Sequence, residues 1–175
     1  MKPKLLLLSD LWGFQDEAWS QDYIAALQHH HEVTLFDSPQ LAGINVKGQS
    51  QDTIHRQLIN GGIETAVQQL RAQVPQSIDM IIGCSVGGVI AWKAILAGLQ
   101  TKKLVAISAT RLRHETQKPD GDIVLYYGEQ DKYRPSAEWS QSLQVTTHLL
   151  PGVGHDVYKE RHFIKKLATN LLSFT

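Results

Sequence analysis

Residues 78–98, I-D-M-I-I-G-C-S-V-G-G-V-I-A-W-K-A-I-L-A-G, decide the fold of this chain. Their apolar run at residues 80–82 is long enough for a strand that is buried on both faces. After a turn that contains Ser85, the segment continues to residue 98 with Lys93 as its only charged side chain, which indicates a buried helix. The stretch therefore predicts a strand, a tight turn that contains a serine, and a helix.

Two glycines bracket the serine in Gly83-Cys84-Ser85-Val86-Gly87. A Cβ atom at Gly83 or Gly87 would collide with the neighbouring strand or helix, so both positions favour glycine. The turn leaves the N–H of Val86 free at the start of the helix, where the helix dipole is positive. This pattern is typical of a nucleophile elbow, which exposes a reactive serine. The alternative is a phosphate-binding turn, but G-C-S-V-G-G fits neither G-x-G-x-x-G nor G-x-x-x-x-G-K-[ST].

The composition is that of an ordinary globular protein, with 175 residues, 42% of them hydrophobic and 19% charged. We expect one domain, residues 1–175. Basic and acidic residues number 17 each, so no positive excess favours a nucleic acid or membrane partner. The single cysteine, Cys84, excludes an internal disulfide and a cysteine-based zinc site. The leucines of residues 5–8 are too few for a signal peptide and no apolar run is long enough to span a membrane, so we expect a cytoplasmic protein.

Strand-like and helix-like segments alternate along the whole chain. Short apolar runs predict strands at residues 4–9, 33–36, 80–82, 104–107, 123–127 and 146–150. Helical spacing predicts helices at residues 17–30, 64–73, 86–98, 137–143 and 163–172, with a short one at 53–59 inside an otherwise irregular segment, 38–61. This order predicts an α/β fold with a doubly wound parallel sheet of about six strands.

Chemistry in such a sheet is expected at the carboxyl ends of the strands. Asp131 comes shortly after the predicted strand 123–127, and His155 comes shortly after the strand 146–150. The order Ser85, Asp131, His155 is that of a nucleophile, an acid and a base in one group of serine hydrolases. The sequence therefore predicts a catalytic triad of these three residues. Glu129 is the nearest rival for the acid, whereas Asp156 is better explained as a helix cap.

The chain resembles the α/β-hydrolase family over nearly its whole length, in G-C-S-V-G, in G-E-Q-D after a strand and in G-V-G-H before the last helix. Residues 10–19, D-L-W-G-F-Q-D-E-A-W, are similar to the H-G-x-G…W oxyanion loop of that family. In this register the backbone N–H groups of Trp12 and Val86 would form the oxyanion hole. Asp10 and Leu11 stand where the family has His-Gly, so Leu11 is the alternative second donor.

The resemblance also implies a minimal core. The two N-terminal strands of the family are missing, and residues 108–122 are too short for the helical cap domain that many members insert there. An open cleft follows, with Leu11, Phe14 and Tyr133 as substrate-pocket residues beside Trp12. Ordinary packing beneath the loops is the alternative explanation of these side chains.

We therefore expect a serine hydrolase that cleaves an ester or thioester of a small acyl substrate through an acyl-enzyme, without a cofactor or metal. The alternatives are a peptidase or C–C hydrolase with the same triad, and a non-catalytic binding protein of the same fold. His29-His30-His31 could bind a metal, but a solvated helix end explains it better. The sequence does not determine the substrate or the oligomeric state.

Overall fold

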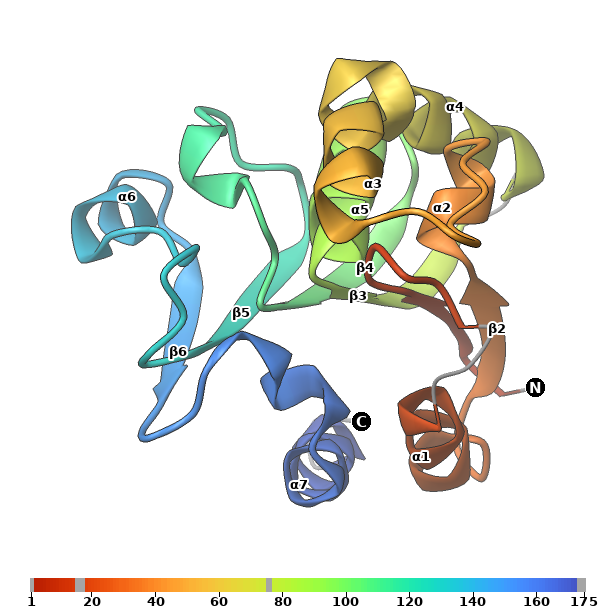
Figure 1. Ribbon diagram of the computed structural model, residues 1–175. Coiled ribbons are helices and arrows are strands. Elements are labelled where there is room, and N and C mark those ends of the chain that lie inside the picture. The colour runs from red at the N-terminus through yellow and green to blue at the C-terminus, as the bar shows by residue number, and fades with distance from the viewer. Residues whose placement is uncertain (1, 15–17, 75–76, 173–175) are drawn as a thin grey trace.

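The computed structural model describes residues 2–14, 18–74 and 77–172. Its centre is a six-stranded, all-parallel sheet with the strand order β2-β1-β3-β4-β5-β6 (Figure 1). This sheet confirms the predicted α/β fold. The strands are β1 (Lys4–Leu8), β2 (Glu32–Phe36), β3 (Ile78–Cys84), β4 (Thr101–Ile107), β5 (Asp122–Gly128) and β6 (Thr146–Leu150).

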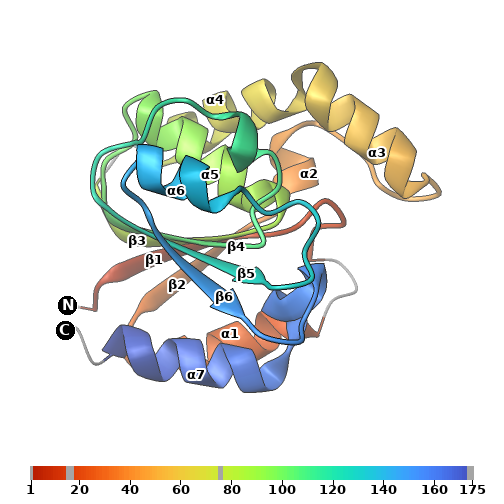
Figure 2. The same ribbon diagram turned by 90° about the vertical axis from the view of Figure 1, so that its left-hand side faces the viewer.

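Helices cover both faces of the sheet. Figures 1 and 2 show α1 (Trp19–Leu27) and α7 (Arg161–Leu172) side by side on one face. The other face carries α2 (Ser38–Leu41), α3 (Gln51–Gln57), α4 (Ile63–Gln73), α5 (Val86–Leu96) and α6 (Ala137–Ser142). Three short turns complete the chain: a π-helical one, η1 (Leu58–Gly62), and two 3-10 ones, η2 (Leu112–His114) and η3 (His155–Lys159).

The alternation of side chains along β1 explains why a continuous apolar run forms this strand. Leu6 and Leu8 belong to the core on the α4 and α5 side, whereas Leu5 and Leu7 belong to the core beneath α1 and α7. All four are buried because helices cover the sheet on both faces. The central helix α5 is apolar around most of its circumference, and its Trp92 is fully buried.

The segment 38–61 is more regular than its sequence predicts. It contains α2, α3 and part of η1, and α3 begins and ends earlier than the predicted helix 53–59. Helix α2 begins where the Asp37 carboxylate accepts a hydrogen bond from the N–H of Gln40 at 2.9 Å. Pro39 lies in its first turn, where a missing N–H costs nothing. The helix predicted at 17–30 is α1, and its predicted start at Glu17 lies outside the described residues.

The carboxyl ends of the six strands face one edge of the sheet. Residues 108–121, between β4 and β5, contain only η2, so no cap domain covers this edge from that connection. None of the helices in the described ranges is long and apolar enough to cross a membrane.

Candidate active site

Ser85 lies in a tight turn between β3 and α5, with the unusual dihedral angles φ 52° and ψ −118°. A Cβ atom at Gly83 would lie 2.7 Å from the carbonyl oxygen of Gly87. One at Gly87 would lie 2.5 Å from the carbonyl oxygen of Ser9 in the loop after β1. Both distances are shorter than any real Cβ contact, so the turn requires glycine at both positions, as predicted. The strained turn holds the serine at the carboxyl edge of the sheet.

The structure brings Ser85, His155 and Asp131 together from the ends of three strands. The Ser85 Oγ lies 3.1 Å from the His155 Nε2, and the His155 Nδ1 lies 2.8 Å from the Asp131 Oδ2. The Asp131 side chain is fully buried, whereas a quarter of the His155 side chain is exposed. The other carboxylate oxygen of Asp131 accepts a hydrogen bond from the N–H of Tyr133 at 2.9 Å. In this arrangement Nδ1–H donates to the carboxylate and Nε2 accepts from the serine.

The two other carboxylates considered for the acid lie elsewhere. Glu129 accepts a long hydrogen bond, 3.4 Å, from the N–H of Gly152 in the neighbouring loop. Asp156 lies inside η3 and accepts a 3.3 Å hydrogen bond from the Tyr158 hydroxyl. No side chain caps η3, and its N-cap residue is Gly154, so the prediction that Asp156 caps a helix is wrong.

The loop after β1 leaves one of its two candidate donor groups unengaged. The Trp12 N–H donates to the Asp10 Oδ1 at 2.9 Å, so it is already occupied. The N–H of Gly13, whose φ is 80°, donates to the Asp10 carbonyl at 3.3 Å and closes the turn. Within the described ranges, the N–H groups of Leu11 and Val86 have no hydrogen-bond partner. These two groups are therefore the ones available to an anionic oxygen.

Asp10 is a functional candidate that sequence reasoning missed. It is 1% exposed, and its Oδ2 accepts a 2.9 Å hydrogen bond from the Tyr158 hydroxyl and lies 3.2 Å from the Lys159 Nζ. Burial, and then the negative charge of Asp10, raise the pKa of Tyr158, so its hydroxyl keeps the proton that it donates. Because Tyr158 and Lys159 belong to η3, Asp10 links the loop after β1 to the loop of His155. The signal in the sequence was an acid directly after an apolar strand.

The comparisons with known proteins rest on structure alone, since no family model and no curated protein matches the sequence. A protein from Xanthomonas campestris pv. campestris assigned to the alpha/beta hydrolase superfamily superposes with a TM-score of 0.67 at 17% identity, over 99% of this chain and 100% of that one. A carboxylesterase structure from Nitrososphaera gargenis gives 0.69 at 12% identity, over 99% and 90% of the two chains. The chain has the α/β-hydrolase fold. The esterase domain of a Rhodothermus marinus protein gives 0.65 at 13% identity, over 98% and 85%.

In this α/β-hydrolase fold, a cavity of about 460 Å³ opens beside Ser85. Of the predicted pocket residues, Leu11 and Tyr133 line it, as does Trp12. Phe14 does not: its ring packs against Trp19 at 5.3 Å between centroids, in the core beneath α1 and α7. Apolar side chains from η1 and the start of α4 form another wall, namely Leu58, Ile59 and Ile63.

Two sequence features have a structural place rather than a chemical one. Cys84, next to the candidate nucleophile, is fully buried, and burial raises the pKa of its thiol well above the ordinary value. It is a core thiol, as expected. His29 and His30 are exposed after α1, but His31 is 3% exposed, so the expectation of a solvated end is wrong for this residue. Among the described residues no group of three or more His, Cys, Asp or Glu side chains could hold a metal ion.

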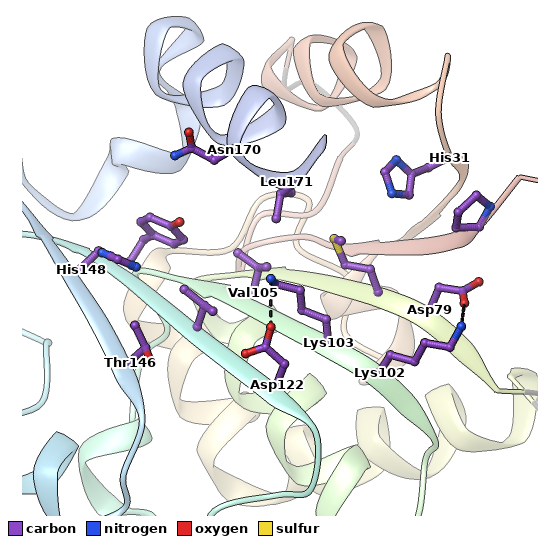
Figure 3. Close-up of a pocket in the computed structure, with 14 residues that line it drawn as sticks. His31, Asp79, Lys102, Lys103, Val105, Asp122, Thr146, His148, Asn170 and Leu171 are labelled. Atoms are coloured by element: carbon purple, nitrogen blue, oxygen red, sulfur yellow. Dashed lines mark hydrogen bonds and ion pairs between the residues drawn. The ribbon is translucent and has the colours of Figure 1, made fainter. Parts of the chain in front are cut away.

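A second cavity, of about 570 Å³, lies at the opposite edge, where β3 to β6 begin (Figure 3). Figure 3 shows that its charged side chains face one another in pairs. The Lys103 Nζ lies 2.9 Å from the Asp122 Oδ2, and the Lys102 Nζ lies 2.6 Å from the Asp79 Oδ1. Because the cavity lies at the opposite edge of the sheet, it is remote from Ser85. The two ion pairs neutralise the charges of its acids and lysines.

Proposed function

We propose that this chain is a serine hydrolase that cleaves esters or thioesters of small acyl substrates. The observation that carries the proposal is the hydrogen-bonded series Ser85–His155–Asp131, whose serine and histidine line a cavity with one apolar wall. The structural neighbours are hydrolases and esterases, which supports hydrolytic chemistry on this fold. A cytoplasmic location belongs to the same proposal.

In the acylation step the Ser85 Oγ attacks the acyl carbonyl carbon while the His155 Nε2 takes the hydroxyl proton. The tetrahedral intermediate collapses as its bond to the alcohol or thiol breaks, and His155 returns the proton to that leaving group. Water, deprotonated in turn by His155, then attacks the acyl-Ser85 ester. As the bond from the acyl carbon to the Ser85 Oγ breaks, His155 returns the proton to this oxygen and the carboxylic acid is released. Asp131 accepts the Nδ1–H throughout, which keeps the imidazole in the tautomer that leaves Nε2 free as a base.

The oxyanion of each tetrahedral intermediate needs donors that point at it before the reaction begins. We assign this role to the N–H groups of Val86 and Leu11, because both are unengaged and both residues line the cavity. The Trp12 N–H, the other donor considered from the sequence, would first have to leave the Asp10 carboxylate. One such donor contributes on the order of 3 kcal/mol to the stability of the transition state.

Turnover of a substrate panel tests the proposal. We expect p-nitrophenyl esters with short acyl chains, or the matching acyl-thioesters, to be hydrolysed with a burst of leaving group equal to the enzyme concentration. The Ser85→Ala variant should lose the burst and the turnover while keeping the thermal unfolding profile of the wild type. Turnover of peptides or β-diketones instead of esters would favour a peptidase or a C–C hydrolase. Absence of turnover on every class would favour a non-catalytic binding protein.

A further inference from the structure

Arg111 lies in the segment that leads from β4 to η2 and lines the same cavity as the candidate nucleophile. The N–H of Thr110 donates to the carbonyl oxygen of Ser85 at 3.2 Å, which fixes this segment against the elbow. Arg111 lines the same cavity as Ser85 and is half-buried. A charged residue of the cavity wall thus directly follows a residue that is hydrogen-bonded to the elbow.

The backbone of this segment is strained. Arg111 has a φ of 68°, in the left-handed region that arginine rarely adopts, and Ser108 has a φ of 48°. The described ranges contain four non-glycine residues with a positive φ. Three of them, Ser85, Ser108 and Arg111, lie at the carboxyl edge of the sheet. Glycine or asparagine would adopt the conformation of Arg111 at lower cost, so the backbone gains nothing from an arginine there. Strain of this kind clusters at ligand sites, which points to a use for the side chain.

The charge of Arg111 is not neutralised by a neighbouring acid. The other cations of the cavity have partners: Arg113 donates to the carbonyl oxygen of Tyr133 at 3.1 Å, and Lys159 pairs with Asp10 at 3.2 Å. Over residues 2–14, 18–74 and 77–172, no carboxylate lies within ion-pair distance of the Arg111 guanidinium. A half-buried guanidinium without an acid partner favours an anionic ligand, which it binds through parallel N–H donors.

We propose that Arg111 binds a single carboxylate on the substrate, so that the preferred esters or thioesters are anionic. The inference rests on the proposed hydrolase function. The cavity wall favours one negative charge rather than several, because Asp52 of α3 and Asp156 of η3 also line it and would repel a diphosphate. The apolar wall of Leu58, Ile59 and Ile63 suits a short hydrocarbon chain between the carboxylate and the ester.

Two matched substrate pairs test this assignment and distinguish which half of the substrate carries the charge. Mono-p-nitrophenyl glutarate against p-nitrophenyl pentanoate tests a carboxylate on the acyl side. The butyrate ester of 4-hydroxybenzoate against that of 4-hydroxybenzamide tests the leaving-group side. In one pair the wild type should favour the anionic member in kcat/KM, and Arg111→Asn should reduce that ratio about tenfold or more, since a hydrogen bond to a charged group is lost.

The choice of variants separates the effect of losing the Arg111 charge from the effect of a change in backbone strain. Asparagine tolerates the left-handed conformation, so Arg111→Asn removes the charge without adding strain. Arg111→Lys should restore part of the ratio, and Arg71→Gln, an exposed arginine of α4 outside the cavity, should leave it unchanged. Equal ratios in the wild type and Arg111→Asn for both pairs would overturn the inference, although turnover of neutral esters would leave the proposed function intact.

A binding measurement keeps the inference testable without turnover. Calorimetric titration of glutarate into the wild type should show binding that Arg111→Asn weakens at least tenfold, by the same charge-assisted contact. Binding that depends on Arg111 would support the anion site even if no ester were hydrolysed. Glutarate that fails to bind, or binds both proteins equally, together with no anionic preference in turnover, would refute it.

Discussion

Replacing Asp10 should impair both stability and catalysis, because this buried carboxylate joins two loops of the candidate site. It accepts the Trp12 N–H and the Tyr158 hydroxyl, each at 2.9 Å, and its Oδ2 lies 3.2 Å from the Lys159 Nζ. A hydrogen bond to a charged group contributes about 1.5–3 kcal/mol. The Lys159 ammonium is partly exposed, so water offsets part of the lost ion pair, and Tyr158 keeps its weaker partner Asp156.

We therefore expect Asp10→Ala to lower the free energy of unfolding by about 3 kcal/mol, which corresponds to a fall in Tm of roughly 6–12 °C for a chain of this size. The freed loop should also misplace the Leu11 N–H, which lowers kcat by up to about a hundredfold, the contribution of one oxyanion donor, with a smaller change in KM. Tyr158→Phe removes one of the three contacts and should have a smaller effect on both quantities.

Thermal unfolding followed by circular dichroism and steady-state kinetics on one neutral ester measure these effects. Asp22→Asn is the matched control, because its ion pair with Arg161 lies at the surface and should contribute at most about 1 kcal/mol. An Asp10→Ala protein with wild-type Tm and kcat would refute the idea that Asp10 fixes the loop. A lower Tm with unchanged kcat would leave Asp10 as a structural residue only.

The remaining predictions concern the acid, the thiol and a buried histidine. Asp131→Asn should lower kcat by several orders of magnitude, roughly 10⁴ by analogy with serine proteases, because Asn favours the wrong His155 tautomer. Glu129→Gln should change kcat little, and the reverse pattern in steady-state kinetics would make Glu129 the acid. Because burial raises the pKa of Cys84, iodoacetamide at mildly alkaline pH should leave the folded protein unmodified by mass spectrometry, and rapid loss of activity on alkylation would contradict this. Burial also lowers the pKa of His31 below 6.5, so the folded state binds that proton less readily than the unfolded state. The stability contributed by neutral His31 is present above pH 6.5 and is lost as the pH falls toward the lowered pKa. Denaturant titrations should therefore show that His31→Gln loses less stability on acidification than the wild type. An identical pH dependence of the two proteins would exclude the effect.

The sheet and the meeting of Ser85, Asp131 and His155 were predictable because the topology of the sheet decides both. In a parallel sheet each strand delivers its next residues to the same edge. Ser85, Asp131 and His155 follow β3, β5 and β6 within a few residues, so their meeting did not depend on the details of any loop. The need for glycine at positions 83 and 87 was equally predictable from the sequence, since the close approach of backbones is a local requirement of the turn.

The loop after β1 was not predictable in the same way. Its path depends on Asp10, whose partner Tyr158 lies 148 residues further along the chain. The Asp10 Oδ1 accepts the Trp12 N–H two residues later, whereas the Asp10 Oδ2 is held from the far end of the chain by the Tyr158 hydroxyl. The Phe14 N–H is likewise held by a side chain distant in sequence, the Asp37 Oδ2 at 3.0 Å, and the Phe14 ring packs against Trp19.

Some differences between prediction and structure have a local signal in the sequence. The start of α2 is one, with an aspartate followed by a serine and a proline. The turn η1 is another, because its break falls at Asn60 and Gly61, whose backbone angles are not helical, and an Asn-Gly pair is typical of such a break. The sequence position of Asp156 predicts a helix cap, whereas its carboxylate accepts a hydrogen bond from the Tyr158 hydroxyl.

The most direct test of the central claim is labelling by a fluorophosphonate probe, which reacts only with an activated serine. The wild type should gain the mass of one phosphonyl group, and peptide mapping should locate it on Ser85. His155→Ala should react far more slowly, because the base that lies 3.1 Å from the Ser85 Oγ is gone, and Ser85→Ala should not react. Wild-type protein that stays unlabelled, or a Ser85→Ala protein that labels as the wild type does, would contradict the account.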